Sequence, residues 1–137
     1  MKAILNQYLK LHIRWRLIIF GIYLIGITYL SLAPSSTFKD IKMPFAFSDK
    51  IAHFLMYGFF VIILRWTING NNTLKWKYIW VLIVSIFYGI LMEFLQLALH
   101  SFGRGFEVAD IIANSLGAFV FWIISNWLFN DEKASTD

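Results

Sequence analysis

Long apolar stretches are the feature that most limits how this chain can fold. The uncharged run over residues 17–38 has 22 residues, and about 20 helical residues cross the hydrocarbon core of a bilayer. A cleaved signal peptide is the alternative for this run, but Pro34 directly after Ala33 is a poor cleavage context. The apolar stretches together predict an all-α fold, a four-helix transmembrane bundle. Its spans are expected at about 15–33, 49–67, 76–99 and 107–128.

Composition supports a membrane protein with one domain. Hydrophobic residues make up 59% and charged residues 15% of the 137 residues, whereas soluble proteins average about 25% charged. We expect a basic amphipathic segment at 1–16, the membrane domain at 17–130 and a polar tail at 131–137. The chain has no cysteine, which excludes disulfides and thiolate metal sites. With a net charge of +4, the basic residues are expected to set topology and contact anionic lipid, with no nucleic-acid partner.

The distribution of Lys and Arg predicts how the bundle is oriented. Residues 1–16 carry four basic residues, and the connection between the second and third spans carries Arg65, Lys75 and Lys77. Short basic loops stay in the cytoplasm, so both termini are predicted inside. Arg65 and Trp66 are interpreted as markers of the cytoplasmic interface. The cytoplasmic halves of the second to fourth helices are nearly all apolar.

Polar residues recur at helical spacing toward the opposite, extracytoplasmic end. The second span has Asp49, Lys50, His53 and Tyr57; the third has Ser85, Gly89, Glu93, Gln96 and His100; the fourth has Glu107, Asp110, Asn114 and Gly117. Spacings of three and four place each stripe on one face of its helix. Ionisable residues in a membrane usually face the bundle interior and are functional by default. We therefore predict one polar site at this end.

The side chains of the polar site indicate acid–base and anion-binding chemistry. His53, Glu93 and Asp110 are the candidate catalytic residues, since His titrates near neutral pH and carboxylates transfer protons. Arg104 lies between two glycines and is a candidate clamp for phosphate or carboxylate. The remaining candidate binding residues are Asp49, Lys50, Tyr57, Gln96, Glu107 and Asn114.

Each of these roles has a structural alternative. Arg104 could simply pair with Glu107 and Asp110, and Asn114 could serve helix packing. A metal site of His53, Glu93 and Asp110 is conceivable, but one secure histidine and no cysteine make zinc weak. We predict neither a metal nor another cofactor. The sequence also lacks the common nucleophile and nucleotide-binding motifs.

The order of these motifs resembles the VanZ-like family. The resemblance rests on Asp49-Lys50-x-x-His53-x-x-x-Tyr57, on Glu93-x-x-Gln96, and on Arg104 followed by Asp110-x-x-x-Asn114-x-x-Gly117. The family comprises small multi-span membrane proteins and is named for a member linked to low-level teicoplanin resistance. The resemblance implies an integral protein of the bacterial cytoplasmic membrane. It supplies no reaction, so whether the chain is an enzyme stays open.

Our leading functional hypothesis is a site at the outer leaflet that binds or modifies an anionic cell-envelope lipid or a lipid-linked precursor. The alternative is a non-catalytic scaffold whose polar stripes only fix helix register. A small transporter subunit is less favoured, because four helices leave little room for a pathway unless the chain forms a homo-oligomer. The expected partners are membrane lipids.

Overall fold

The described part of the chain is an all-α bundle of four helices, which confirms the predicted fold class. The structure, a computed structural model, describes residues 11–34, 37, 48–68, 77–99 and 105–130. Its helices are α2 (Ile13–Leu32), α3 (Ser48–Ile68), α4 (Lys77–Ala98) and α5 (Val108–Asn130). All four are long and apolar enough to cross a membrane, with mean hydropathy between 1.7 and 2.1.

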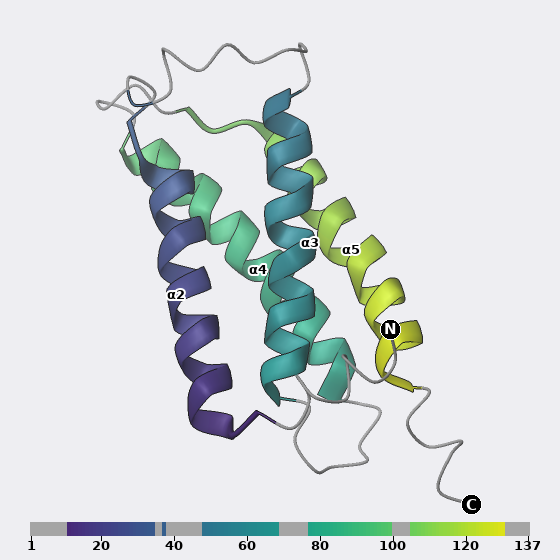
Figure 1. The fold of residues 1–137 in the computed structure, drawn as a ribbon. Helices are drawn as coiled ribbons and strands as arrows, with labels where there is room; N and C mark the ends of the chain where they lie inside the picture. Colours follow the sequence, from purple (N-terminus) through teal and green to yellow (C-terminus); the bar gives the residue numbers. More distant parts are fainter. Residues whose placement is uncertain (1–10, 35–36, 38–47, 69–76, 100–104, 131–137) are drawn as a thin grey trace, which may run out of the picture.

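Helix α3 lies at the centre of the bundle and contacts the other three helices (Figure 1). Successive helices run in opposite directions. The end of α2, the start of α3, the end of α4 and the start of α5 therefore lie at the same end of the molecule (Figure 1). We call this the Lys50 end and the opposite one the Arg65 end. This shared end is what allows polar residues from separate spans to meet.

The closest helix contact is between α3 and α5. A Cβ atom at Gly117 would overlap the backbone carbonyl of Phe54, and one at Gly58 would overlap the ring of Phe121. Small residues let membrane helices approach to backbone contact in this way. A small apolar core lies next to this contact, toward the Arg65 end, and is formed by Val61, Val81, Leu82 and Ala118.

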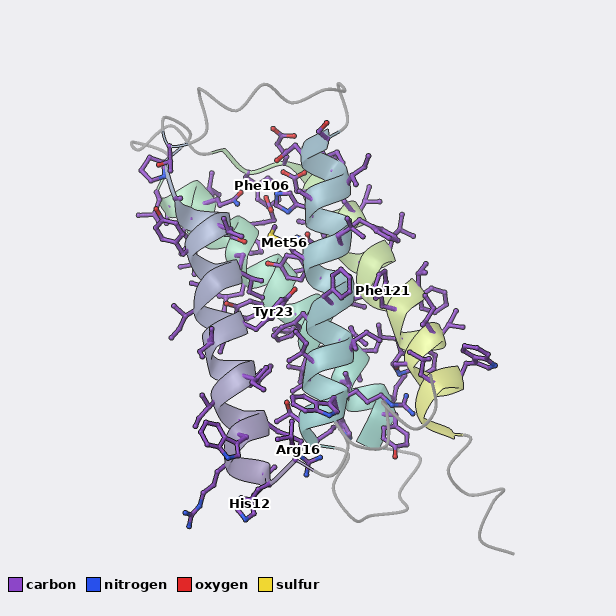
Figure 2. All side chains as sticks on the ribbon, viewed as in Figure 1. His12, Arg16, Tyr23, Met56, Phe106 and Phe121 are labelled. Carbon is purple, nitrogen blue, oxygen red and sulfur yellow. The ribbon has the colours of Figure 1, made fainter. Side chains whose placement is uncertain are left out.

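The outer surface of the bundle is apolar. Phe87 is 72% exposed, Ile25 71% and Trp127 69%, and they come from three different helices. Figure 2 shows side chains of this kind projecting from every helix. Soluble monomers rarely expose contiguous apolar surface of this extent. The exposed side chains are therefore those expected to contact lipid, which fits a multi-pass membrane protein.

The Arg65 end is more polar than the sequence indicated. Arg65, interpreted above as an interface marker, is fully buried. Its Nη1 donates to Ser125 Oγ at 3.1 Å and to Asn126 Oδ1, and its guanidinium lies 3.9 Å from the centre of the Tyr78 ring. An arginine at a span end usually extends its charge toward water. Here Ser125 and Asn126 on α5 and the Tyr78 ring on α4 contact it inside the bundle instead.

Arg16 also departs from the interfacial segment predicted at 1–16. Helix α2 already begins at Ile13, and Arg16 is buried within it. Its Nη1 donates to the carbonyl of Trp66 at 3.0 Å, which ties the start of α2 to the end of α3. Residues 1–10 and the predicted tail at 131–137 lie outside the described residues.

Candidate functional site

Lys50 stands in the first turn of α3 and is surrounded by carboxylates. Its Nζ lies 2.5 Å from Glu107 Oε2, 2.5 Å from Asp110 Oδ1 and 3.2 Å from Asp49 Oδ2. Two of these partners come from the start of α5, so one ammonium group ties α3 to α5. Three carboxylates around a single ammonium also leave this group of side chains with an excess of negative charge.

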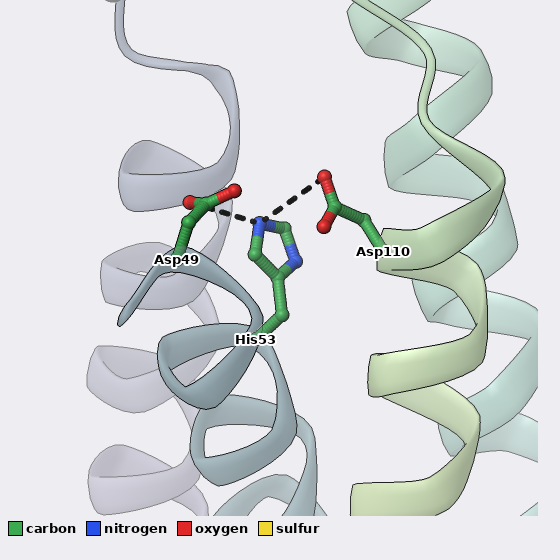
Figure 3. A group of neighbouring side chains, drawn as sticks. All are labelled: Asp49, His53 and Asp110. Atoms are coloured by element: carbon green, nitrogen blue, oxygen red, sulfur yellow. Dashed lines mark ion pairs between the residues drawn. The ribbon is translucent and has the colours of Figure 1, made fainter. Parts of the chain in front are cut away.

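His53 lies one turn further along α3 and is buried. Its Nδ1 is 3.0 Å from Asn114 Oδ1. Because an amide oxygen only accepts hydrogen bonds, this contact places a proton on Nδ1. The other nitrogen, Nε2, faces Asp49 Oδ1 at 3.8 Å and Asp110 Oδ2 at 3.9 Å (Figure 3). His53 is therefore oriented from behind by an amide and points at two carboxylates.

Glu93 comes from α4 and is fully buried. Its Oε2 accepts a hydrogen bond from the backbone N–H of Glu107 at 3.3 Å, just before α5 begins. Free N–H groups at a helix start favour a negative charge. Its Oε1 has no hydrogen-bond partner. Within the described residues, Glu93 forms no ion pair with Lys50 or His53.

Gly89 brings two more predicted site residues together. A Cβ atom at this glycine would lie 3.1 Å from the ring of Tyr57 and 3.1 Å from Asn114 Cβ. The glycine therefore lets α4 approach both side chains closely. Tyr57 and Asn114 are buried, and the Tyr57 hydroxyl and Asn114 Nδ2 both lack a hydrogen-bond partner.

Gln96 connects the polar residues of α4 to α2. Its Nε2 donates to the carbonyl of Ser31 at 2.8 Å, in the last turn of α2. Ser31 was not singled out from the sequence, although a serine at the same end of the first span is a usable signal. Ser85, by contrast, had been placed in the polar stripe of the third span. Its hydroxyl donates to the carbonyl of Val81 in its own helix at 2.7 Å.

These contacts join predicted site residues from α3, α4 and α5 into one group, which we call the His53 cluster. Its members are Asp49, Lys50, His53, Tyr57, Glu93, Glu107, Asp110 and Asn114. Two further predicted residues, His100 and Arg104, lie outside the described part of the chain. Gln96 borders the cluster on the side that faces α2, and Gly117 borders it at the α3–α5 contact.

Comparison with known proteins identifies the family. A family model described as VanZ/LLP1 matches residues 20–129. The chain belongs to the VanZ/LLP1 family. The match spans every member of the His53 cluster, and it confirms the resemblance seen in the sequence. No curated protein and no solved structure matches this VanZ/LLP1 chain.

The geometry gives this VanZ/LLP1 chain groups that can accept and donate protons. A neutral His53 with its proton on Nδ1 has a free lone pair on Nε2, which is the form that acts as a general base. Glu93 Oε1 is a buried acceptor, and Asn114 Nδ2 and the Tyr57 hydroxyl are buried donors, all without partners. Such groups can bind and orient a polar molecule that enters the cluster.

Proposed function

We propose that the His53 cluster binds the polar headgroup of an anionic cell-envelope lipid, or of a lipid-linked precursor, at the outer leaflet. The carrying observation is the set of buried polar atoms without partners, above all Glu93 Oε1 and Asn114 Nδ2. Buried polar atoms in native proteins are nearly always hydrogen-bonded, so a ligand, an ion or a water is expected beside these atoms. The cluster lies at one end of the spans, which is the depth at which headgroups are found.

Basic and acidic side chains of the site would bind different parts of the headgroup. Phosphate is taken by Lys50 and by Arg104, whose fork suits phosphate oxygens. Hydroxyl or amine groups of the headgroup are hydrogen-bonded by the carboxylates and by Asn114. If the bound lipid is also modified, His53 or Glu93 transfers the proton and Asp110 orients Arg104 or His53. Binding or modification of such a lipid would link the protein to teicoplanin tolerance.

A scaffold without a ligand is the second candidate. The observation that favours it is the bridging position of Lys50, whose ion pairs with Glu107 and Asp110 join α3 to α5. On this reading the cluster only holds the helices in register. It would then bind no lipid, and its substitutions would act through stability alone.

Native mass spectrometry of the gently purified protein separates the two candidates. We expect a lipid to remain bound to the wild type and to be lost from His53→Ala, Glu93→Gln and Arg104→Ala. Ser85→Ala is the matched control, because Ser85 is a buried polar residue of α4 that is satisfied within its own helix. The same variants, expressed from the native locus, should alter growth under teicoplanin. Folded variants that keep the lipid and grow as wild type would contradict the proposal.

A further inference from the structure

Three donor atoms of the His53 cluster have the arrangement of metal ligands. Asp49, His53 and Asp110 each offer one atom, and these atoms lie within 4.8 Å of one another. The separations of 3.8 Å and 3.9 Å from His53 Nε2 to the two carboxylates are too long for hydrogen bonds. Donors bound at about 2.1 Å to a shared ion lie roughly 3 to 4.2 Å apart. The two carboxylate oxygens lie within 4.8 Å of each other.

The second atom of each ligand is already engaged. Lys50 binds Asp49 Oδ2 and Asp110 Oδ1, so Oδ1 of Asp49 and Oδ2 of Asp110 are the oxygens that face His53. Asn114 holds the Nδ1 side of the imidazole and leaves Nε2 directed between the two carboxylates (Figure 3). Partners of this kind, which fix the tautomer and the ring, accompany nearly every histidine that binds a metal. Lys50 therefore holds the other oxygen of each carboxylate ligand.

Charge is the second argument for a cation. Asp49 and Asp110 place two carboxylates beside the single ammonium group of Lys50, and one oxygen of each faces His53 Nε2. A cation between these three atoms would offset the excess of negative charge.

We propose that Asp49, His53 and Asp110 bind a divalent cation between Asp49 Oδ1, His53 Nε2 and Asp110 Oδ2. The sequence had led us to predict no metal, and its best alternative used Glu93 in place of Asp49. In the structure Glu93 is bonded to the backbone of Glu107 instead, and Asp49 takes its place beside His53. One imidazole and two carboxylates favour Mn²⁺ or Zn²⁺ over Ca²⁺ and Mg²⁺, which prefer oxygen ligands alone.

Three protein ligands leave coordination positions open. A phosphate oxygen of the headgroup could fill one of them, and this part of the inference rests on the proposed function. A divalent ion would also explain how side chains with an excess of negative charge bind an anionic headgroup, because the ion attracts the carboxylates and the phosphate alike. The cation site itself does not depend on the lipid.

Titration with Mn²⁺ tests the site directly. The full-length protein in detergent is stripped with chelator, Mn²⁺ is added, and the free ion is followed by electron paramagnetic resonance. We expect one Mn²⁺ per chain, displaced by Zn²⁺. Asp49→Asn and His53→Gln should each weaken binding by at least about 10-fold, since even outer-shell changes cost 10- to 100-fold. Asp49 is exposed enough that its conservative variant is expected to fold.

Two controls separate coordination from general charge. Glu107→Gln removes a carboxylate charge beside Lys50, as Asp49→Asn does, but it removes no proposed ligand. The two side chains are similarly exposed, 58% for Glu107 and 53% for Asp49. His12→Gln removes an exposed histidine at the Arg65 end. Both should change the affinity by less than about 3-fold. Equal losses in Glu107→Gln and Asp49→Asn, or no Mn²⁺ bound to the wild type, would overturn the inference. Lipid retained by the stripped protein would show that the proposed function stands without the cation.

Discussion

Gly117 is the residue at which α3 and α5 come closest. Its missing side chain is what permits contact with the backbone of Phe54, so replacement with alanine must push the helices apart. We expect Gly117→Ala to lower the free energy of unfolding by about 1–3 kcal/mol, the usual cost of overpacking. The measurement is an unfolding titration in mixed detergent micelles.

Gly26→Ala is the control for that substitution. Gly26 lies in α2 with no atom within 4 Å of where its Cβ would be. Alanine has the higher helix propensity, by about 1 kcal/mol, so this variant should be as stable as the wild type or slightly more stable. If the two variants behave alike, the α3–α5 contact is looser than the structure shows.

At the site, sequence spacing predicted which residues share a helix face, but it did not predict their hydrogen-bond or ion-pair partners. The i, i+4 relation of Asp49 and His53 correctly places both on one side of α3. That Asn114 orients His53, and that Glu93 bonds a backbone N–H rather than Lys50, could not be predicted from spacing. Which atoms meet depends on rotamers and on the distance between helices, and periodicity contains neither.

Among the four helices, α2 depends most on single hydrogen bonds for its attachment to the bundle. It has the smallest buried share of the four spans, and its bonds to the rest of the bundle use backbone carbonyls repeatedly. Tyr23, for example, donates its hydroxyl to the carbonyl of Met56 at 2.7 Å. A carbonyl belongs to every residue, so such an acceptor leaves no mark in the sequence. This is why the anchoring of α2 was not predicted.

Removing one of these bonds should loosen α2 selectively. Tyr23→Phe keeps the ring and loses only the hydroxyl, and hydrogen bonds between membrane helices contribute about 0.6 kcal/mol on average. We expect amide hydrogen exchange to rise in peptides from α2 and to stay unchanged in α5. Tyr29→Phe, at a side chain that is 61% exposed, should leave both helices unchanged. Uniform changes across the bundle would show that α2 does not open independently.

The orientation of the whole molecule is a prediction that cysteine labelling can test. Because the chain has no cysteine, each introduced thiol is the only one present. Gly105→Cys, at an exposed position with open space, should react with a membrane-impermeant maleimide in intact cells. Ser135→Cys, in the tail predicted inside, should react only after lysis. The reverse pattern would place the His53 cluster on the cytoplasmic side and exclude an outer-leaflet ligand.

At the scale of the whole molecule, the fold followed from the sequence more completely than the site did. Four apolar runs of spanning length are sufficient to predict four helices, because hydropathy alone identifies such segments well. The polar contacts around Arg65 were not predicted, because hydropathy and charge counts locate spans and their ends but not the partners of a side chain inside the bundle. Counting Lys and Arg assigns charged residues to the membrane surface, and it has no means of finding an arginine whose partners are Ser125 and Asn126 on another span.

Polar contacts join helix α3 to α5 toward both ends, through Lys50 near one end and through Arg65 near the other. Axial sliding of one helix along the other would break both connections together. Membrane helices commonly adapt to bilayers of different thickness by tilting. In this protein the two helices must tilt as a pair, so a thinner bilayer changes their inclination while the spacing of the groups around His53 is preserved.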